Sequence, residues 1–242
     1  MASVASRVKR KVSTLPAGAI FRLDDISNHR DEILAVAHKL SRMVKSGEIK
    51  RVSKGRYFKP RHSVFGELGP AQSEVLKQLV NPKSDKPAYV TGIALYNNLG
   101  LTNQVPAVIS VAYNKERAPL ELADVKVKFV KQSNKITRRN IPLLRILDVI
   151  KGYNKIPNKV DKVVMEWLQS RIESLDSRQR RSLINLALSY NPRSRALLGA
   201  ILDHLGFEED ADRLRRSINP LSRYEVNISS DVLSKKEDWG IV

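Results

Sequence analysis

The first sixty residues predict, in order, a helix, a short strand, a short helix, a longer helix and a hairpin. Residues 2–15 predict a basic amphipathic helix, because apolar side chains recur at helical spacing: Val4, Val8, Val12 and Leu15. Residues 19–21 (AIF) favour a short strand, and residues 22–28 (RLDDISN) a short second helix. A stronger helix is expected over residues 30–46, with an apolar stripe formed by Ile33, Val36, Ala37, Leu40, Met43 and Val44.

The hairpin is predicted over Gly47–Pro60 (GEIKRVSKGRYFKP). Its turn is expected at residues 53–55, where Gly55 can adopt a positive φ. Five cations are interleaved with its β-forming residues: Lys50, Arg51, Lys54, Arg56 and Lys59. Like charges across a hairpin repel one another, so this arrangement predicts an anionic partner that offsets the repulsion.

The order of these elements predicts a winged helix-turn-helix. In this fold the longer helix lies in the major groove of DNA and the hairpin is a wing that rests on the phosphates. Arg42 is the expected base contact, because arginine can bond guanine with two hydrogen bonds. The predicted helix face also carries His38, Lys39, Ser41 and Lys45. The wing cations are expected to contact phosphates, which position the domain without reading sequence: Lys50, Arg51, Lys54 and Arg56, with Lys59 beside them.

Each of these features also has a simpler interpretation. A charged helix face is commonly only solvated, and lysines on an edge strand often serve to discourage aggregation. The ordered combination of elements and the local excess of positive charge favour DNA binding.

The middle of the chain predicts a small mixed α/β unit. Residues 61–70 are expected to form the inter-domain connection and residues 71–80 a helix. Residues 88–106 favour an extended entry followed by a helix that ends at Gly100. Strands are expected over 107–113 and 124–131, where apolar and polar residues alternate in the second, and a helix over 141–151.

The last third of the chain is predicted to be mainly helical. Its four expected helices cover residues 158–175, 176–190, 192–206 and 208–218, and residues 224–242 are expected to be irregular or to add one strand. The predicted fold class is therefore α+β and multidomain. The predicted divisions are a winged helix-turn-helix over 1–64, the α/β unit over 65–152 and a helical segment over 153–242.

Composition adds a statement about partners. The chain has 242 residues and a formal net charge of +18. Up to His62 there are 15 lysines and arginines against 5 acidic residues, a net of +10, whereas residues 63–152 carry +6 and residues 153–242 carry +2. This gradient places the surface that attracts anions at the N-terminus, and double-stranded DNA is the expected partner.

Other features exclude several classes of protein. There is no cysteine, which excludes disulfides, thiolate zinc sites and cysteine nucleophiles. No apolar run reaches the roughly 18 residues that a membrane span needs, and the basic N-terminus lacks the apolar core of a secretory signal. A cytoplasmic protein without membrane partners is expected.

Catalytic chemistry is not predicted. We find no glycine-rich phosphate loop, and the four histidines do not lie at metal-ligand spacing. No catalytic residue, metal ligand or cofactor is therefore expected, and the chain is not expected to be an enzyme. Asp124 followed by Lys126 and Lys128 faintly resembles the acidic and lysine arrangement of some nucleases, but no second acid accompanies it.

Three stretches resemble the AbiEi family of antitoxins, the transcription-regulating halves of type IV toxin-antitoxin systems. They are LPAGAIFRLDDIS (15–27), AHKLSRMVKSGEIKRVSKGRYFKP (37–60) and YVTGIALYNNLGLTNQVPAVISVA (89–112). The first two would fit many winged-helix regulators, and the third makes the resemblance more specific.

The resemblance implies a protein with two activities. The N-terminal domain would bind operator repeats in its own promoter and repress the operon. The remainder would neutralise a cognate toxin of the nucleotidyltransferase type, with or without a stable direct contact. Two alternatives stay open: a winged-helix regulator whose second domain senses an effector, and a DNA nuclease.

Overall fold

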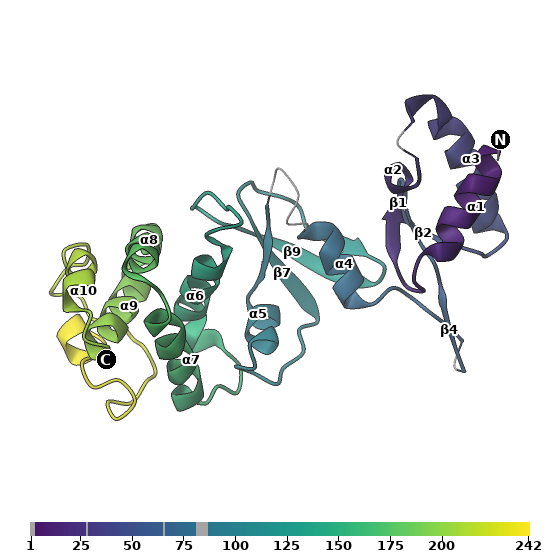
Figure 1. Cartoon of the computed structure of the whole chain (residues 1–242). Coiled ribbons are helices and arrows are strands. Elements are labelled where there is room, and N and C mark those ends of the chain that lie inside the picture. The colour runs from purple at the N-terminus through teal and green to yellow at the C-terminus, as the bar shows by residue number, and fades with distance from the viewer. Residues whose placement is uncertain (1–2, 28, 65, 81–86) are drawn as a thin grey trace. The chain divides into compact units, whose positions relative to one another are not determined.

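The computed structural model describes residues 3–27, 29–64, 66–80 and 87–242. Figure 1 follows the chain from the purple N-terminus to the yellow C-terminus. Contacts within the chain divide it into two compact units. Unit 1 comprises Met1–Asn81 and Pro119–Val127, and unit 2 comprises Pro82–Ala118 and Lys128–Val242.

Unit 1 contains a winged helix-turn-helix, which confirms the predicted fold of the N-terminal region. Its elements are α1 (Val4–Thr14), β1 (Ile20–Arg22), α2 (Leu23–Ile26), the short 3-10 helix η1 (Arg30–Glu32), α3 (Ile33–Lys45), β2 (Lys50–Ser53) and β3 (Arg56–Phe58). The three strands form an antiparallel sheet in the order β1-β3-β2. The predicted strand at 19–21 and the predicted helices thus lie within one or two residues of their expected ends, except that the first turn of the expected long helix is 3-10.

The core of the winged helix joins α1, α3 and the sheet. Val8 and Val12 of α1 belong to the same buried cluster as the apolar stripe of α3. On the sheet side of this cluster, the rings of Phe21 and Tyr57 stack with their centroids 5.9 Å apart. Both residues occupy paired positions of β1 and β3, so cross-strand packing and helix packing support one another.

A second small core covers the winged helix from another side. Residues 61–70, expected to be a connection, instead contain a hairpin of β4 (Arg61–Ser63) and β5 (Gly66–Leu68). The chain continues into α4 (Gln72–Leu79), and Val75 of this helix packs with Ile20, Phe58 and Leu122. Unit 1 therefore extends beyond the predicted boundary at residue 64, because these apolar side chains need α4 and the later segment 119–127 to be buried.

The later segment of unit 1 is the hairpin of β8 (Leu120–Leu122) and the start of β9 (Val125–Lys131). Strand β8 was not predicted. Ala123 and Asp124 connect the paired residues Leu122 and Val125, and their φ values are +50° and +64°. Two consecutive positive φ values are the signature of a type I′ turn, so Asp124 occupies a structural turn position.

Unit 2 combines a sheet with a bundle of helices. Its elements before the bundle are β6 (Tyr89–Thr91), α5 (Ile93–Asn98), β7 (Val108–Tyr113) and the second half of β9. The sheet order is β6-β7-β9-β8, and β9 passes from one unit to the other between Val127 and Lys128. The helices are α6 (Ile141–Gly152), η2 (Tyr153–Lys155), α7 (Asp161–Glu173), α8 (Ser177–Ala187), α9 (Pro192–His204) and α10 (Glu208–Arg215).

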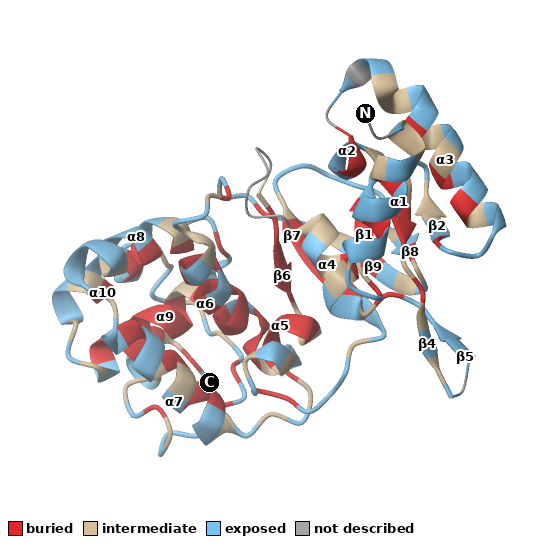
Figure 2. Cartoon of the chain, turned by 45° about the vertical axis from the view of Figure 1, so that its right-hand side comes forward, coloured by how far each residue is buried: buried red, intermediate tan, exposed pale blue. Residues whose placement is uncertain are grey.

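One hydrophobic core spans most of unit 2. It includes Leu95 of α5, Leu147 of α6, Leu168 of α7 and Leu198 of α9, and it reaches Ile241 near the C-terminus. Figure 2 shows the buried residues in red along α6 and α9. The predicted division at residue 152 therefore does not separate two cores, because α6 packs with helices on both sides of that position in sequence.

A buried carboxylate ties the sheet of unit 2 to its helices. Asp148 of α6 accepts hydrogen bonds from the hydroxyls of Tyr89 (2.9 Å) and Thr91 (2.6 Å) in β6. It also accepts one from the hydroxyl of Tyr190 (2.8 Å), which follows α8. Burial raises the pKa of Asp148 above its usual value, and the three hydroxyls partly oppose this effect because they bond the charged form.

The C-terminal segment is anchored by Trp239, which lies in the 3-10 helix η3 (Glu237–Trp239). Its indole N–H donates a hydrogen bond to Asp203 of α9 (2.7 Å), and the guanidinium of Arg215 lies 4.3 Å from the ring centroid. The ring packs directly on Gly199 of α9, where an added Cβ would lie 2.2 Å from the nearest ring carbons. Glycine at 199 is therefore required by this close approach.

We expect Gly199→Ala to destabilise unit 2. In an open helix the change would add about 1 kcal/mol of stability, whereas overpacking of a filled site costs about 1–3 kcal/mol. Because the nearest atoms belong to a fully buried ring, the overpacking cost should exceed the gain. Chemical denaturation followed by circular dichroism measures the difference.

The double variant Gly199→Ala with Trp239→Leu tests the cause. Its cost should be smaller than the sum of the two single costs by about 1 kcal/mol, because the smaller side chain leaves room for the new methyl group. Strictly additive costs would show that Gly199 acts for another reason.

Candidate nucleic-acid interface

Burial of one stripe fixes the rotation of α3 about its axis. Val36, Leu40 and Met43 are only 1%, 0% and 2% exposed, and their spacing of four and three residues is that of one helix face. The opposite face must consequently point away from the core of unit 1.

The outer face of α3 carries most of the predicted contact residues. His38, Ser41, Arg42 and Lys45 are all exposed and recur at helical spacing. The pattern starts one turn earlier with Leu34, which is 75% exposed although it is apolar. A face of this composition offers hydrogen-bond donors, two fixed cations and one apolar contact to a groove of DNA.

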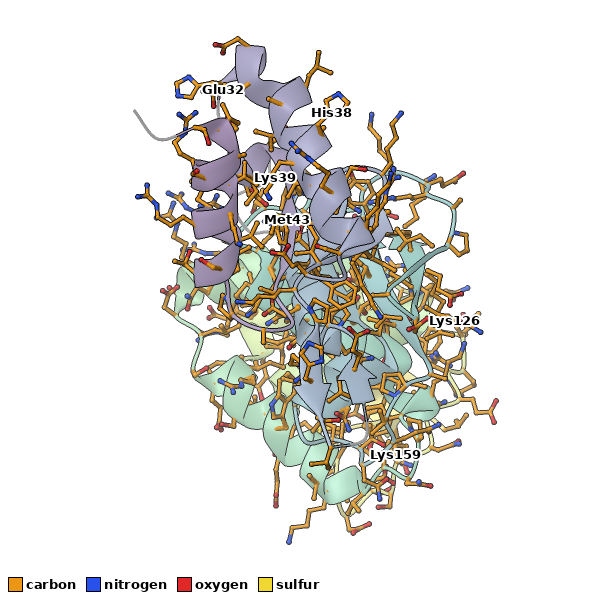
Figure 3. All side chains as sticks on the ribbon, turned by 90° about the vertical axis from the view of Figure 1, so that its right-hand side faces the viewer. Glu32, His38, Lys39, Met43, Lys126 and Lys159 are labelled. Atoms are coloured by element: carbon orange, nitrogen blue, oxygen red, sulfur yellow. The ribbon has the colours of Figure 1, made fainter. Side chains whose placement is uncertain are left out.

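Lys39 does not belong to this outer face. It is half-buried, because it is three residues from Val36 and four from Met43 and so lies beside the buried stripe. In Figure 3, His38 lies on the outer side of α3, whereas Lys39 and Met43 lie toward α1. The predicted role of Lys39 as an equal member of the contact face therefore receives no support from its position.

The wing is a short irregular hairpin. Ser53 pairs with Arg56, Arg51 pairs with Tyr57, and the register shifts between Arg51 and Ser53. Gly55 has a φ of +71°, as predicted for the turn. The carbonyl of Gly55 accepts a hydrogen bond from the backbone N–H of Leu23 (3.1 Å), so the tip of the wing is tied to the start of α2.

The wing cations differ in what they contact within unit 1. Lys54 is exposed at the turn. Arg51 is exposed on β2, where its guanidinium donates a long hydrogen bond of 3.4 Å to the carbonyl of Ser53. Arg56 is half-buried and lies opposite Arg22 in the sheet. Two arginines at paired positions repel one another. This repulsion lowers the stability of the sheet when no anion is bound, as was expected for the cations of the hairpin.

Lys50 lies in a mixed environment. Its ammonium forms an ion pair with Glu67 of the β4-β5 hairpin, which holds the pKa of Glu67 below its usual value. Lys50 and Arg51 also line a cleft of unit 1 together with three carboxylates, those of Glu67, Glu121 and Asp124. Acidic groups repel phosphates, so the wing is a better phosphate contact at its tip than at this end.

Lys59 has a structural partner. Its ammonium donates hydrogen bonds to the carbonyls of Ser13 (2.8 Å) and Leu15 (3.1 Å), at the C-terminal end of α1. A cation at this position satisfies carbonyls that lack helical partners and offsets the negative end of the helix dipole. Lys11 makes a comparable contact with the carbonyl of Ile26 (2.9 Å), at the end of α2.

An ion pair connects α1 with the start of α3. The guanidinium of Arg7 donates a hydrogen bond to the carboxylate of Glu32 and lowers the pKa of that carboxyl. The pair therefore stabilises unit 1 at neutral pH, and its contribution is lost as the pH falls through the lowered pKa of Glu32.

Unit 2 carries a second set of cations that the sequence did not predict as a group. Lys128, Lys131, Lys151, Lys155 and Arg193 line one pocket of unit 2. They come from β9, from the end of α6 and η2, and from α9. No spacing along the chain indicates such a set, because only the folding of unit 2 brings these elements together.

Two further searches concern metals and membranes. Within the described residues, no group of three or more histidine, aspartate or glutamate side chains is placed to hold a metal ion. None of the helices in the described part of the chain is both long enough and apolar enough to cross a membrane.

Comparison with protein families matches residues 7–179 to DUF6088, a family of unknown function. The chain belongs to the DUF6088 family. The matched range begins within α1 and ends within α8. It therefore includes the winged helix from Arg7 onward and the sheet of unit 2.

This DUF6088 protein is also similar to a solved structure, that of the RV2827C protein from Mycobacterium tuberculosis. The TM-score is 0.54 at 11% sequence identity, and the match covers 92% of this chain and 84% of the other. The similarity at this identity concerns the fold. A search among curated proteins returns no match.

We expect Lys59→Met to lower the stability of unit 1 by about 1 kcal/mol, because two carbonyls at the end of α1 lose a charged donor. Lys54→Met is the matched control, since Lys54 is exposed at the wing turn. Thermal denaturation compares both variants with the wild-type protein. Equal melting temperatures for the two variants would contradict the capping role of Lys59.

Proposed function

We propose that this DUF6088 protein is a DNA-binding antitoxin of the AbiEi type, which represses its own operon through unit 1 and neutralises a nucleotidyltransferase-type toxin through unit 2. The observation that carries the proposal is the outer face of α3. His38, Ser41, Arg42 and Lys45 are exposed together on the helix that a winged helix places in the major groove.

Charge supports DNA as the partner of unit 1. Arg42 and Lys45 on α3 and Lys54 on the wing are exposed cations with no carboxylate within 4.0 Å among the described residues. Groups of this kind gain most from meeting phosphates, because binding releases the counterions of DNA. The cytoplasm, where the promoter is accessible, is the compartment that this function requires.

The antitoxin part of the proposal is supported by the resemblance to AbiEi antitoxins. The first two of the resembling stretches form α2, α3 and the wing of unit 1, with the strand and the turn that precede them. The third stretch, residues 89–112, forms β6, α5 and most of β7 in unit 2. The resemblance thus extends over secondary structure of both units and includes more than a DNA-binding module.

Arg42 and Lys54 should behave differently when each is replaced by alanine. Both variants should lower the slope of log affinity against log salt by about one unit, since each removes one cation from the interface. Only Arg42→Ala should also lose preference for promoter DNA over scrambled DNA, by about 1–3 kcal/mol, because a base contact is lost. Fluorescence anisotropy with both DNAs over a series of salt concentrations measures slope and preference together.

Arg178→Ala is the control for this experiment, because Arg178 is exposed on α8 of unit 2. It should leave both quantities unchanged. An unchanged salt slope in Arg42→Ala and Lys54→Ala alike would contradict the winged-helix interface. Equal losses on both DNAs would make Arg42 a phosphate contact.

Truncation is a poor way to separate the two activities. A fragment that ends near residue 64 would lack Val75 and Leu122, which bury Ile20 and Phe58 of the winged-helix sheet. A fragment that ends at residue 81 would still lack the segment 119–127 of unit 1. Substitutions in the full chain keep both units intact.

We expect the triple variant Arg42→Ala, Lys45→Ala, Lys54→Ala to lose repression and to retain neutralisation of the toxin. The three side chains are exposed on unit 1, so their removal leaves the core of unit 2 untouched. The test expresses the toxin encoded beside this gene and supplies the variant from an unrelated inducible promoter. Growth rescue reports neutralisation, and a reporter fused to the native promoter reports repression.

The same assay distinguishes the alternatives. Rescue by the triple variant supports a neutralising activity separate from DNA binding. Failure of the triple variant alongside rescue by wild type and by Arg178→Ala would show that the protective effect depends on DNA binding.

A further inference from the structure

Unit 2 contains a pocket of about 470 Å³ with a basic rim and a polar floor. This volume lies within the range of about 300–1,000 Å³ that is typical of small-molecule sites. Thr91, Ser110 and Gln132 contribute polar groups to its floor, and all three are buried. A cavity with this lining is suited to a polar ligand.

The cations of the rim converge from separate elements. Lys128 lies on β9, Lys151 in the last turn of α6, Lys155 at the end of η2, and Arg193 in the first turn of α9. Among the described residues, none of these four has a carboxylate oxygen within 4.0 Å. The fifth cation, Lys131, is paired with Glu116 at 3.0 Å and contributes less.

Internal contacts hold part of this rim in place. The guanidinium of Arg193 donates a hydrogen bond to the carbonyl of Lys151 (3.3 Å), which joins the start of α9 to the end of α6. The ammonium of Lys151 lies 5.7 Å from the ring centroid of Tyr190. Tyr190 is in turn bonded to Asp148, so the two cations rest on the buried polar network.

Charge and shape together restrict the ligand. Asp148 is the one acidic residue among the described lining residues, and its carboxylate already accepts three hydrogen bonds. The N-terminal end of α9 lies at the pocket with Asn191 and Arg193, and its partial positive charge adds to that of the rim. A compact dianion suits such a converging set better than a singly charged phosphodiester does, because a phosphate monoester carries close to two charges at neutral pH.

We infer that this pocket of unit 2 binds a phosphate dianion, either free inorganic phosphate or the phosphate monoester group of a mononucleotide. The rim cations Lys128, Lys151, Lys155 and Arg193 contact the phosphate. The hydroxyls of Thr91 and Ser110 are the floor groups left to bond the remainder of the ligand, because the side-chain amide of Gln132 already donates and accepts hydrogen bonds within the protein. This site is independent of the proposed DNA interface, which lies on unit 1.

The experiment uses the full-length chain and three probes: inorganic phosphate, AMP and adenosine. Isothermal titration calorimetry should show saturable binding of AMP and no binding of adenosine. Inorganic phosphate that binds as tightly as AMP would identify the free anion as the ligand, whereas tighter binding of AMP would show that the nucleoside contributes.

The matched variants are Lys128→Ala with Lys155→Ala, and Arg138→Ala with Arg139→Ala. All four side chains are exposed in unit 2, and only the first pair lines the pocket. The first double variant should weaken AMP binding about tenfold or more, since two charge-assisted contacts are lost, and the second should change it less than about twofold. Melting temperatures confirm that both variants are folded.

Two results would overturn the inference. One is that neither inorganic phosphate nor AMP binds more tightly than adenosine. The other is an equal loss in both double variants, which would reduce the effect to the general positive charge of the protein. Neither result bears on promoter binding by unit 1, which is measured separately.

Discussion

The packing of Val36, Leu40 and Met43 against the core of unit 1 is the constraint on which the proposed interface depends. A helix has one rotation at which these three side chains are buried together, and that rotation determines which residues remain outside. Arg42 and Lys45 are exposed because burial of the apolar stripe turns their side of the helix outward. The function proposed for α3 is therefore a consequence of its hydrophobic face.

The net charge of the N-terminal region overstates the number of cations that are free to contact the proposed DNA partner. Lys11 and Lys59 bond carbonyls at the ends of α2 and α1, and Arg7 and Lys50 are paired with carboxylates. Lys11 and Lys59 satisfy carbonyls that lack helical partners at the ends of α2 and α1. Part of the positive charge in unit 1 thus has a structural role, and only geometry distinguishes a capping lysine from one that is exposed at the tip of the wing.

Sequence patterns predicted the helices well and the divisions of the chain poorly. The spacing of apolar residues placed α3 and the four C-terminal helices, because each is long enough for a helical repeat of buried residues to be visible. The strands β4, β5 and β8 were missed, since segments of three residues are too short for a period of two to be visible. The boundary of unit 1 was misplaced for a different reason: Leu122 completes a core around Phe58, and no local signal indicates a contact between residues so distant in the chain. The exposed face of α3 was expected from the sequence, except that Lys39 lies beside the buried stripe. Lys59, which follows β3, was expected on the same surface but bonds carbonyls at the end of α1. The basic pocket of unit 2 was not predicted, because its residues converge only in the folded chain.

Asp148 explains how the basic rim of that pocket can be held in one place. Burial of a carboxylate is costly, and three hydroxyl donors offset part of that cost. These bonds fix Tyr190 relative to α6, and Tyr190 immediately precedes the N-terminal cap of α9. Arg193 and Lys151 consequently stand at fixed positions although both are long side chains near the surface. Asp148 thus holds Lys151 and Arg193 in place through Tyr190 and the backbone, and no carboxylate at the rim is needed to position them. The positive charge of these two side chains therefore remains available to an anion from solution.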